Sequence, residues 1–248
     1  YIIDYGQWPE QKDKNITLRN LRTTLSKLYP DTTLEHRLRE ALTGLSQSIL
    51  DVNFKREDNV ELAVSRLMID ANWGQTRDVV YNWCRTSKWK AYVMPSHGRG
   101  IGASSQPLNH GKSKKGGVKI GSHWRVETSK EMPIRYCLYD ANLWKSYTAA
   151  RLKCPAGTEG SISIPKQNPR EHKALVDNLI AEYPVRVEGR GRTVEEWKLK
   201  PGQDNHWWDC VVGCCVVANM EGVKMRGEKK VKQQEQKAPR SPKKAVLL

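Results

Sequence analysis

Apolar side chains recur at intervals of three and four positions between residues 17 and 50, a spacing that places them on one face of a helix. This pattern predicts two helices, separated at Tyr29-Pro30-Asp31. The remaining polar and apolar pattern predicts helices at residues 76–85, 142–152, 170–182 and 206–220.

Short apolar runs bounded by polar or turn-forming residues predict the strands. We expect them at residues 1–5, 62–69, 91–94, 124–127, 134–139 and 160–164, with a hairpin at 185–187 and 194–199. Strands that alternate with helices predict an α/β fold, and the hairpins predict a mixed sheet.

Two segments lack a regular apolar period. Residues 97–122 are rich in Gly, Ser and Lys, and we expect a long, mobile, basic loop there. Residues 222–248 are rich in Lys, Gln and Pro, a composition that favours disorder. The predicted organisation is therefore one domain over residues 1–221, with residues 17–50 as a helical elaboration, followed by a flexible basic tail.

Positive charge is concentrated in two parts of the chain. The 248 residues include 42 Lys and Arg against 27 Asp and Glu, a formal net charge of +15. Residues 79–126 contain basic side chains and no acidic one, and residues 222–248 are also strongly basic. Such concentration is typical of a protein that binds a polyanion, so nucleic acid is the expected partner. The predicted phosphate contacts are Arg99, Lys112, Lys114, Lys115, Lys119 and Arg125.

Several other classes of protein are excluded by the sequence. The longest apolar run, Cys210 to Ala218, is too short to cross a bilayer, so no membrane role is expected. The six cysteines form no C-x-x-C pair, which argues against a zinc site or a disulfide scaffold and favours reduced thiols in a cytosolic compartment. Gly111-Lys112-Ser113 resembles the end of a phosphate-binding loop, but Gln106 occupies the position of the required first glycine. We therefore expect no ATPase activity from this chain.

The chain has no initiator Met, and we expect it to be a fragment of a longer polypeptide.

Three carboxylates occupy positions where chemistry is expected. Asp4 and Asp70 each follow a predicted strand, and in open α/β sheets ligands bind beyond the strand ends. Asp209 lies in the most apolar predicted helix, where a buried carboxylate needs a basic partner or a cation. Together they could hold two magnesium ions. Alternatively, Asp70 begins a loop and Asp4 caps a turn. His206 lies on the same helical face as Asp209 and is either a further ligand, a general base, or a capping or packing residue.

The order of several short segments carries a family resemblance. These segments are Tyr1 to Gln7, Leu67 to Asn72, the predicted helix 76–85, Tyr139-Asp140 with Lys145, Ser163 to Pro165, and Asn205 to Cys210. Together they resemble the nuclease region of large terminase subunits of tailed bacteriophages of the lambdoid type, over roughly residues 1–220. The resemblance implies a ribonuclease-H-like fold and a metal-dependent endonuclease that cuts concatemeric DNA during packaging. In such proteins an ATPase motor precedes this region.

The same resemblance implies a site and partners. Asp4 would bridge two Mg²⁺ or Mn²⁺ ions, and Asp70 and Asp209 would each complete one ion site, with one ion activating water and the other stabilising the departing oxygen. Double-stranded DNA would be the substrate, the small terminase subunit and the portal protein would be partners, and the host cytoplasm would be the location.

Two alternatives remain open at this point. The chain could be another ribonuclease-H-like nuclease of the junction resolvase or integrase type, which would cut branched DNA. It could also be a catalytically silent module that binds DNA or the portal, in which the carboxylates are structural. Such a module would bind DNA irrespective of magnesium and would not cut it.

Overall fold

A five-stranded mixed sheet forms the centre of the molecule. The computed structural model describes residues 1–109, 119–164 and 168–225. The strand order is β3 (Leu67–Asp70), β4 (Val93–Arg99), β7 (Arg135–Asp140), β6 (Trp124–Thr128) and β5 (Ile120–Gly121). The first three strands run parallel and the last two pair antiparallel, which confirms the predicted α/β class with a mixed sheet. The carboxyl ends of β3, β4 and β7 therefore meet at one edge of the sheet.

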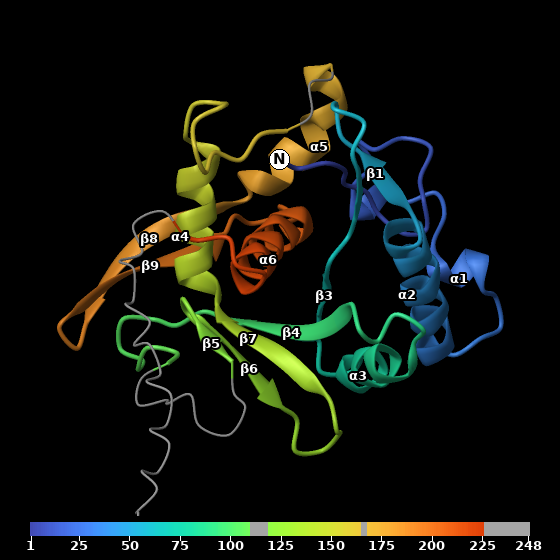
Figure 1. Cartoon of the computed structure of the whole chain (residues 1–248), viewed down its shortest axis with the longest axis horizontal. Coiled ribbons are helices and arrows are strands. Elements are labelled where there is room, and N and C mark those ends of the chain that lie inside the picture. The colour runs from blue at the N-terminus through green and yellow to red at the C-terminus, as the bar shows by residue number, and fades with distance from the viewer. Residues whose placement is uncertain (110–118, 165–167, 226–248) are drawn as a thin grey trace, which may run out of the picture.

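Helices α4 (Ala141–Leu152) and α6 (His206–Met220) pack on one face of this sheet (Figure 1). Strand residues on the face that these helices cover, such as Cys137 and Tyr139, join Trp144 of α4 and Trp208 of α6 in the main core. Helix α6 is apolar because it crosses this core, where Val212 and Val216 are fully buried. Both helices were predicted from the sequence, and both are confirmed.

The opposite face of the sheet is covered by α3 (Arg77–Thr86), against which α2 (Leu34–Leu50) packs. Alternation along β3 explains the two layers: Met68 contacts the first core, and Leu67 and Ile69 contact the second. Helix α1 (Leu25–Leu28) and a single 3₁₀ turn (Leu18–Asn20) precede α2. The predicted break at Tyr29-Pro30-Asp31 is confirmed, although the first of the two helices is only one turn long.

Two hairpins and a short helical pair complete the described chain. The hairpins are β1 (Asn53–Lys55) with β2 (Glu61–Ala63), and β8 (Glu182–Gly189) with β9 (Arg192–Leu199). The second one turns at Arg190 and Gly191, which both have positive φ, as a tight two-residue hairpin turn requires. A 3₁₀ turn (Pro169–His172) leads into α5 (Lys173–Leu179) within the predicted helix 170–182.

Two predicted strands are absent, and a third, 62–69, is divided between β2 and β3. Residues 1–5 and 160–164 are in neither a strand nor a helix, although the Ile2 N–H donates to the Ser163 carbonyl at 2.8 Å. The apolar run at the start of the chain suggested burial, yet Tyr1 and Ile3 are exposed. Asp4 consequently does not lie at the end of a strand.

The expected loop at 97–122 is partly regular structure and partly packed chain. β4 extends to Arg99 and β5 begins at Ile120. Between them, Ala103 and Leu108 are buried. The described part of the segment is therefore anchored, and residues 110–118 lie outside the described residues.

Contacts with the fold continue past residue 221, where the domain was expected to end. The Gly222 N–H donates to the Asn219 carbonyl, and Gly222 has a φ of 105°, typical of the glycine that ends a helix. Met225 packs against the main core, and the domain boundary stays a prediction. The tail beyond it, 226–248, lies outside the described residues. Within the described ranges, no helix is long and apolar enough to cross a membrane.

Candidate active site

Asp70 and Asp209 come together at the carboxyl edge of the parallel strands. Asp70 is the last residue of β3, and Asp209 lies in the first turn of α6. Desolvation raises the pKa of Asp70, and the negative charge of Asp209 raises it further, while the backbone N–H groups of Asn72 and Ala71 oppose the shift. Two of the three predicted carboxylates are therefore electrostatic neighbours.

Tyr139 lies beside both carboxylates. Its ring is buried in the main core, and burial raises the pKa of the phenol, with smaller contributions from Asp70 and Asp209. Gly98 of β4 makes room for it, because a Cβ at that position would lie 2.8 Å from the Tyr139 hydroxyl oxygen. The buried Tyr139 ring therefore packs next to Asp70 and Asp209.

A network of three polar side chains holds Asp209. The Lys145 Nζ of α4 lies 2.9 Å from Asp209 Oδ1, and 2.7 and 2.8 Å from the two carboxylate oxygens of Glu182. The Asn205 side-chain amide donates to Glu182 at 2.5 Å and to Asp209 Oδ2 at 3.1 Å. Asp209 therefore has a basic partner, which comes from another helix rather than from its own, although its side chain is half exposed and not buried as expected.

Asp4 is placed differently. Its carboxylate forms an ion pair with Lys14 at 2.9 Å, its side chain is 66% exposed, and it accepts the N–H of Tyr5. No interaction links it to Asp70 or Asp209 among the described residues. In that same part of the chain, no group of three or more His, Cys, Asp and Glu side chains is arranged to hold a metal ion. The three-carboxylate arrangement with Asp4 as the bridge stays a prediction.

His206 is the exposed first residue of α6, and no hydrogen bond joins it to Asp209 among the described residues. Its role as a ligand also stays a prediction.

Three of the six predicted phosphate contacts lie in the described part of the chain. Arg99 is exposed at the end of β4, on the same sheet edge as Asp70. Lys119 donates to the Met220 carbonyl at 2.7 Å, at the end of α6. Arg125 is 9% exposed and forms an ion pair with Glu127 at 2.6 Å, so its guanidinium is already engaged inside the fold. The remaining three, Lys112, Lys114 and Lys115, lie outside the described residues.

Sequence reasoning missed Glu182 and the side-chain role of Asn205. Glu182 is the first residue of β8, shortly after the end of α5, and carries no local signal of burial. Asn205 occupies the N-cap position of α6, but its side chain makes no capping hydrogen bond. Its side-chain amide donates instead to Glu182 and Asp209, a role that the sequence alone does not indicate.

Asp140 is a further carboxylate at the same sheet edge. It is buried, and desolvation raises its pKa. Its side chain accepts the Leu143 N–H at 3.3 Å and so caps α4. This arrangement gives Asp140 a structural task.

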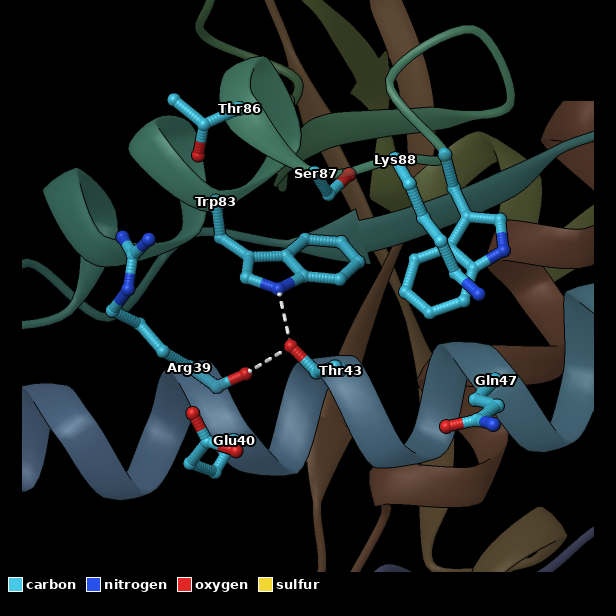
Figure 2. Close-up of a pocket in the computed structure, with 9 residues that line it drawn as sticks. Arg39, Glu40, Thr43, Gln47, Trp83, Thr86, Ser87 and Lys88 are labelled. Carbon is cyan, nitrogen blue, oxygen red and sulfur yellow. Dashed lines mark hydrogen bonds between the residues drawn. The ribbon is translucent and has the colours of Figure 1, made fainter.

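A pocket lies elsewhere, between α2 and α3 (Figure 2). It has a volume of about 270 Å³, and Figure 2 shows the Trp83 indole directed at the Thr43 hydroxyl on its floor. Glu40 is the single acid that lines it, so this described pocket offers no pair of carboxylates. The acidic pair at Asp70 and Asp209 is therefore the stronger candidate for a catalytic site.

Comparison with known proteins identifies a family for this chain. A sequence model of one family, described as terminase large subunit gpA, endonuclease domain, matches residues 1–231. No curated protein and no solved structure matches the chain. The mixed sheet flanked by helices is consistent with the ribonuclease-H-like fold expected for such a nuclease. Because the match spans nearly the whole sequence, the chain belongs to the family of terminase large subunit gpA endonuclease domains.

Proposed function

We propose that this domain is a divalent-metal-dependent endodeoxyribonuclease that cuts concatemeric viral DNA during genome packaging. The observation that carries the proposal is the meeting of Asp70 and Asp209 at the carboxyl edge of the parallel strands. Membership of the endonuclease family supports DNA as the substrate. By the same family argument, the small terminase subunit and the portal protein are the proposed partners, and the host cytoplasm is the proposed location.

The residues of the site fit Mg²⁺ or Mn²⁺. Magnesium is commonly held by one or two carboxylates together with substrate phosphate and water, rather than by a complete cage of protein ligands. Asp70 and Asp209 supply two such carboxylates, and both remain accessible to solvent. When bound, the ion polarises the phosphoryl oxygen and makes water a stronger nucleophile. We also propose a second ion at this site, with Asp4 as the carboxylate that bridges the two ions.

The chain's own groups prepare this site. Lys145 and Asn205 each donate to one oxygen of Asp209, which fixes the carboxylate before substrate arrives. Tyr139 lies buried beside the two carboxylates. Arg99 offers a positive charge to a DNA phosphate at the same edge, a contact that positions the duplex without reading its sequence.

The proposal is tested by nicking of supercoiled plasmid with Mg²⁺, with Mn²⁺ and with a chelator. We expect cleavage only with metal. Asp70→Asn and Asp209→Asn keep the size of the side chain and remove its charge, so each should abolish cleavage. Asp177→Asn is the matched control, because Asp177 lies on α5 in an ion pair with Lys173. An Asp209→Asn domain that nicks at the wild-type rate would contradict the proposal.

The same assay separates the alternatives. Preference for a four-way junction over linear DNA would indicate a resolvase-type enzyme. DNA binding that is indifferent to magnesium, without cleavage, would indicate a silent binding module. Asp4→Asn tests the third carboxylate: loss of cleavage supports the bridging role, and full activity excludes it. We expect no ATP hydrolysis in any of these reactions.

A further inference from the structure

We infer that Lys145 and Glu182 form a positioning pair, which holds the Asp209 carboxylate in the orientation that binds the catalytic ion. The inference rests on the proposed function, because it concerns the same site. It assigns a task to two residues that touch neither the substrate nor the ion and act through Asp209.

The hydrogen bonds converge on Glu182. An ammonium group has three N–H donors, and the Lys145 ammonium contacts three oxygens: two of Glu182 and one of Asp209. The Asn205 amide divides its contacts in the same way, between Glu182 Oε1 and Asp209 Oδ2. Each oxygen of Asp209 thus receives one donor, and both donors are anchored on the same buried carboxylate.

Among the described residues, no further donor occupies the remaining acceptor positions of Asp209, which leaves them to a cation. A carboxylate has about four lone-pair sites, and the network uses one on each oxygen. The single positive charge of Lys145 is shared between Glu182 and Asp209, so the cluster keeps an excess negative charge. The arrangement therefore orients Asp209 without neutralising its attraction for metal.

Burial shows that the pair is not needed for packing alone. The side chains of Lys145 and Glu182 are 12% and 4% exposed, whereas that of Asp209 is 48% exposed. Taking a charged pair out of water is costly, and apolar residues of similar size usually hold two elements together as well or better. Contact between α4 and β8 therefore does not explain the pair. The pair is explained by its contact with the half-exposed carboxylate of Asp209.

The decisive variant replaces both members of the pair with apolar residues. Lys145→Met combined with Glu182→Met removes the donor to Asp209 without leaving a buried charge unpaired, so the fold should be kept. Mn²⁺ binding is measured calorimetrically without DNA, alongside thermal unfolding and plasmid nicking. We expect an unfolding temperature at or above that of the wild type and Mn²⁺ binding weakened by about 10-fold or more, the usual effect of losing a group that orients a metal ligand.

Two further variants complete the test. Lys173→Gln with Asp177→Asn removes an exposed ion pair on α5 and should leave Mn²⁺ binding unchanged. Asn205→Ala removes the donor to the other oxygen of Asp209 and no capping hydrogen bond, so it should fold and bind Mn²⁺ more weakly. This variant keeps the inference testable if the double methionine variant fails to fold.

The outcomes separate the inference from the proposed function. If the wild type binds Mn²⁺, Asp209→Asn loses this binding, and the folded positioning variants bind it as well as or better than the wild type, the inference is overturned and the proposed function stands. If the wild type neither binds Mn²⁺ nor cuts DNA, the proposed function itself fails, and the inference fails with it.

Discussion

The charge on Asp70 opposes folding as long as no metal is bound. Its pKa is raised by desolvation and then by Asp209, so the folded state holds the proton more tightly than the unfolded chain does. A group of this kind lowers stability progressively as the pH rises through its unfolded value, about 3.9, to its folded value, and the full cost persists at neutral pH.

Asp70→Asn should therefore raise the denaturant midpoint of unfolding at pH 7 in metal-free buffer. The gain should shrink as the pH falls below about 4, where the carboxyl is protonated in both states. The midpoints of both proteins, measured at intervals of about one pH unit from about pH 3 to about pH 8, check this dependence. A gain that is equally large at every pH would mean that the charge is not its cause.

Asp51 provides a control of opposite sign. Hydrogen bonds from Lys88 at 2.7 Å and from the Trp89 indole at 2.6 Å lower its pKa, so its charge favours folding above the unfolded value. Asp51→Asn should lower the midpoint at pH 7, and this loss should disappear in acid.

At the scale of the element, α2 is attached to the domain through a small number of identifiable contacts. The buried Trp83 indole N–H of α3 donates to the Thr43 hydroxyl at 3.0 Å, and this hydroxyl donates to the Arg39 carbonyl at 2.8 Å (Figure 2). The contact lies on the face of the sheet opposite to α6. The helical elaboration is thus part of the fold, at a distance from the acidic pair.

Thr43→Val should destabilise the domain by about 1–3 kcal/mol, because it leaves the buried indole N–H without an acceptor. Chemical unfolding measures the change. Thr43→Ser keeps the hydroxyl and should cost less. Plasmid nicking by folded Thr43→Val should match the wild type, and a loss of cleavage at a temperature where the variant is folded would link α2 to the active site.

The elements themselves were largely predictable because their patterns are local. Helix α3 has apolar residues at helical spacing, α6 is apolar along its length, and the β8–β9 hairpin has a turn that only a few sequences favour. The wrong strand at residues 1–5 shows the limit of this reasoning. An apolar run resembles a strand, but a strand also needs a neighbour with which to pair, and the sequence does not name that neighbour.

At the scale of the whole molecule, the site was only partly predictable. Asp70 and Asp209 stood out because each is a carboxylate in an apolar setting. Glu182 and Asn205 did not, because their importance arises from being brought beside Lys145, far away in the sequence. Arg125 shows the converse: basic composition suggested a DNA contact, and the fold pairs it with Glu127.

The basic segment leads to a last prediction about DNA binding. Lysines that neutralise DNA phosphates release counterions, so affinity falls with salt in proportion to the number of phosphates neutralised. Replacing Lys112, Lys114 and Lys115 by Ala should weaken binding to DNA of any sequence. It should also flatten the logarithmic salt dependence by about one unit for each phosphate that is no longer neutralised. Binding titrations at several salt concentrations measure both effects.

The control must remove the same charge elsewhere. Lys55, Lys130 and Lys153 are exposed and lie outside the segment 79–126, so replacing all three by Ala lowers the net charge equally. If the segment forms the DNA-binding surface, the control variant should keep most of the wild-type salt slope, because distant exposed charges are largely screened. Equal losses of affinity in both variants would mean that total charge, and not this segment, governs the affinity for DNA.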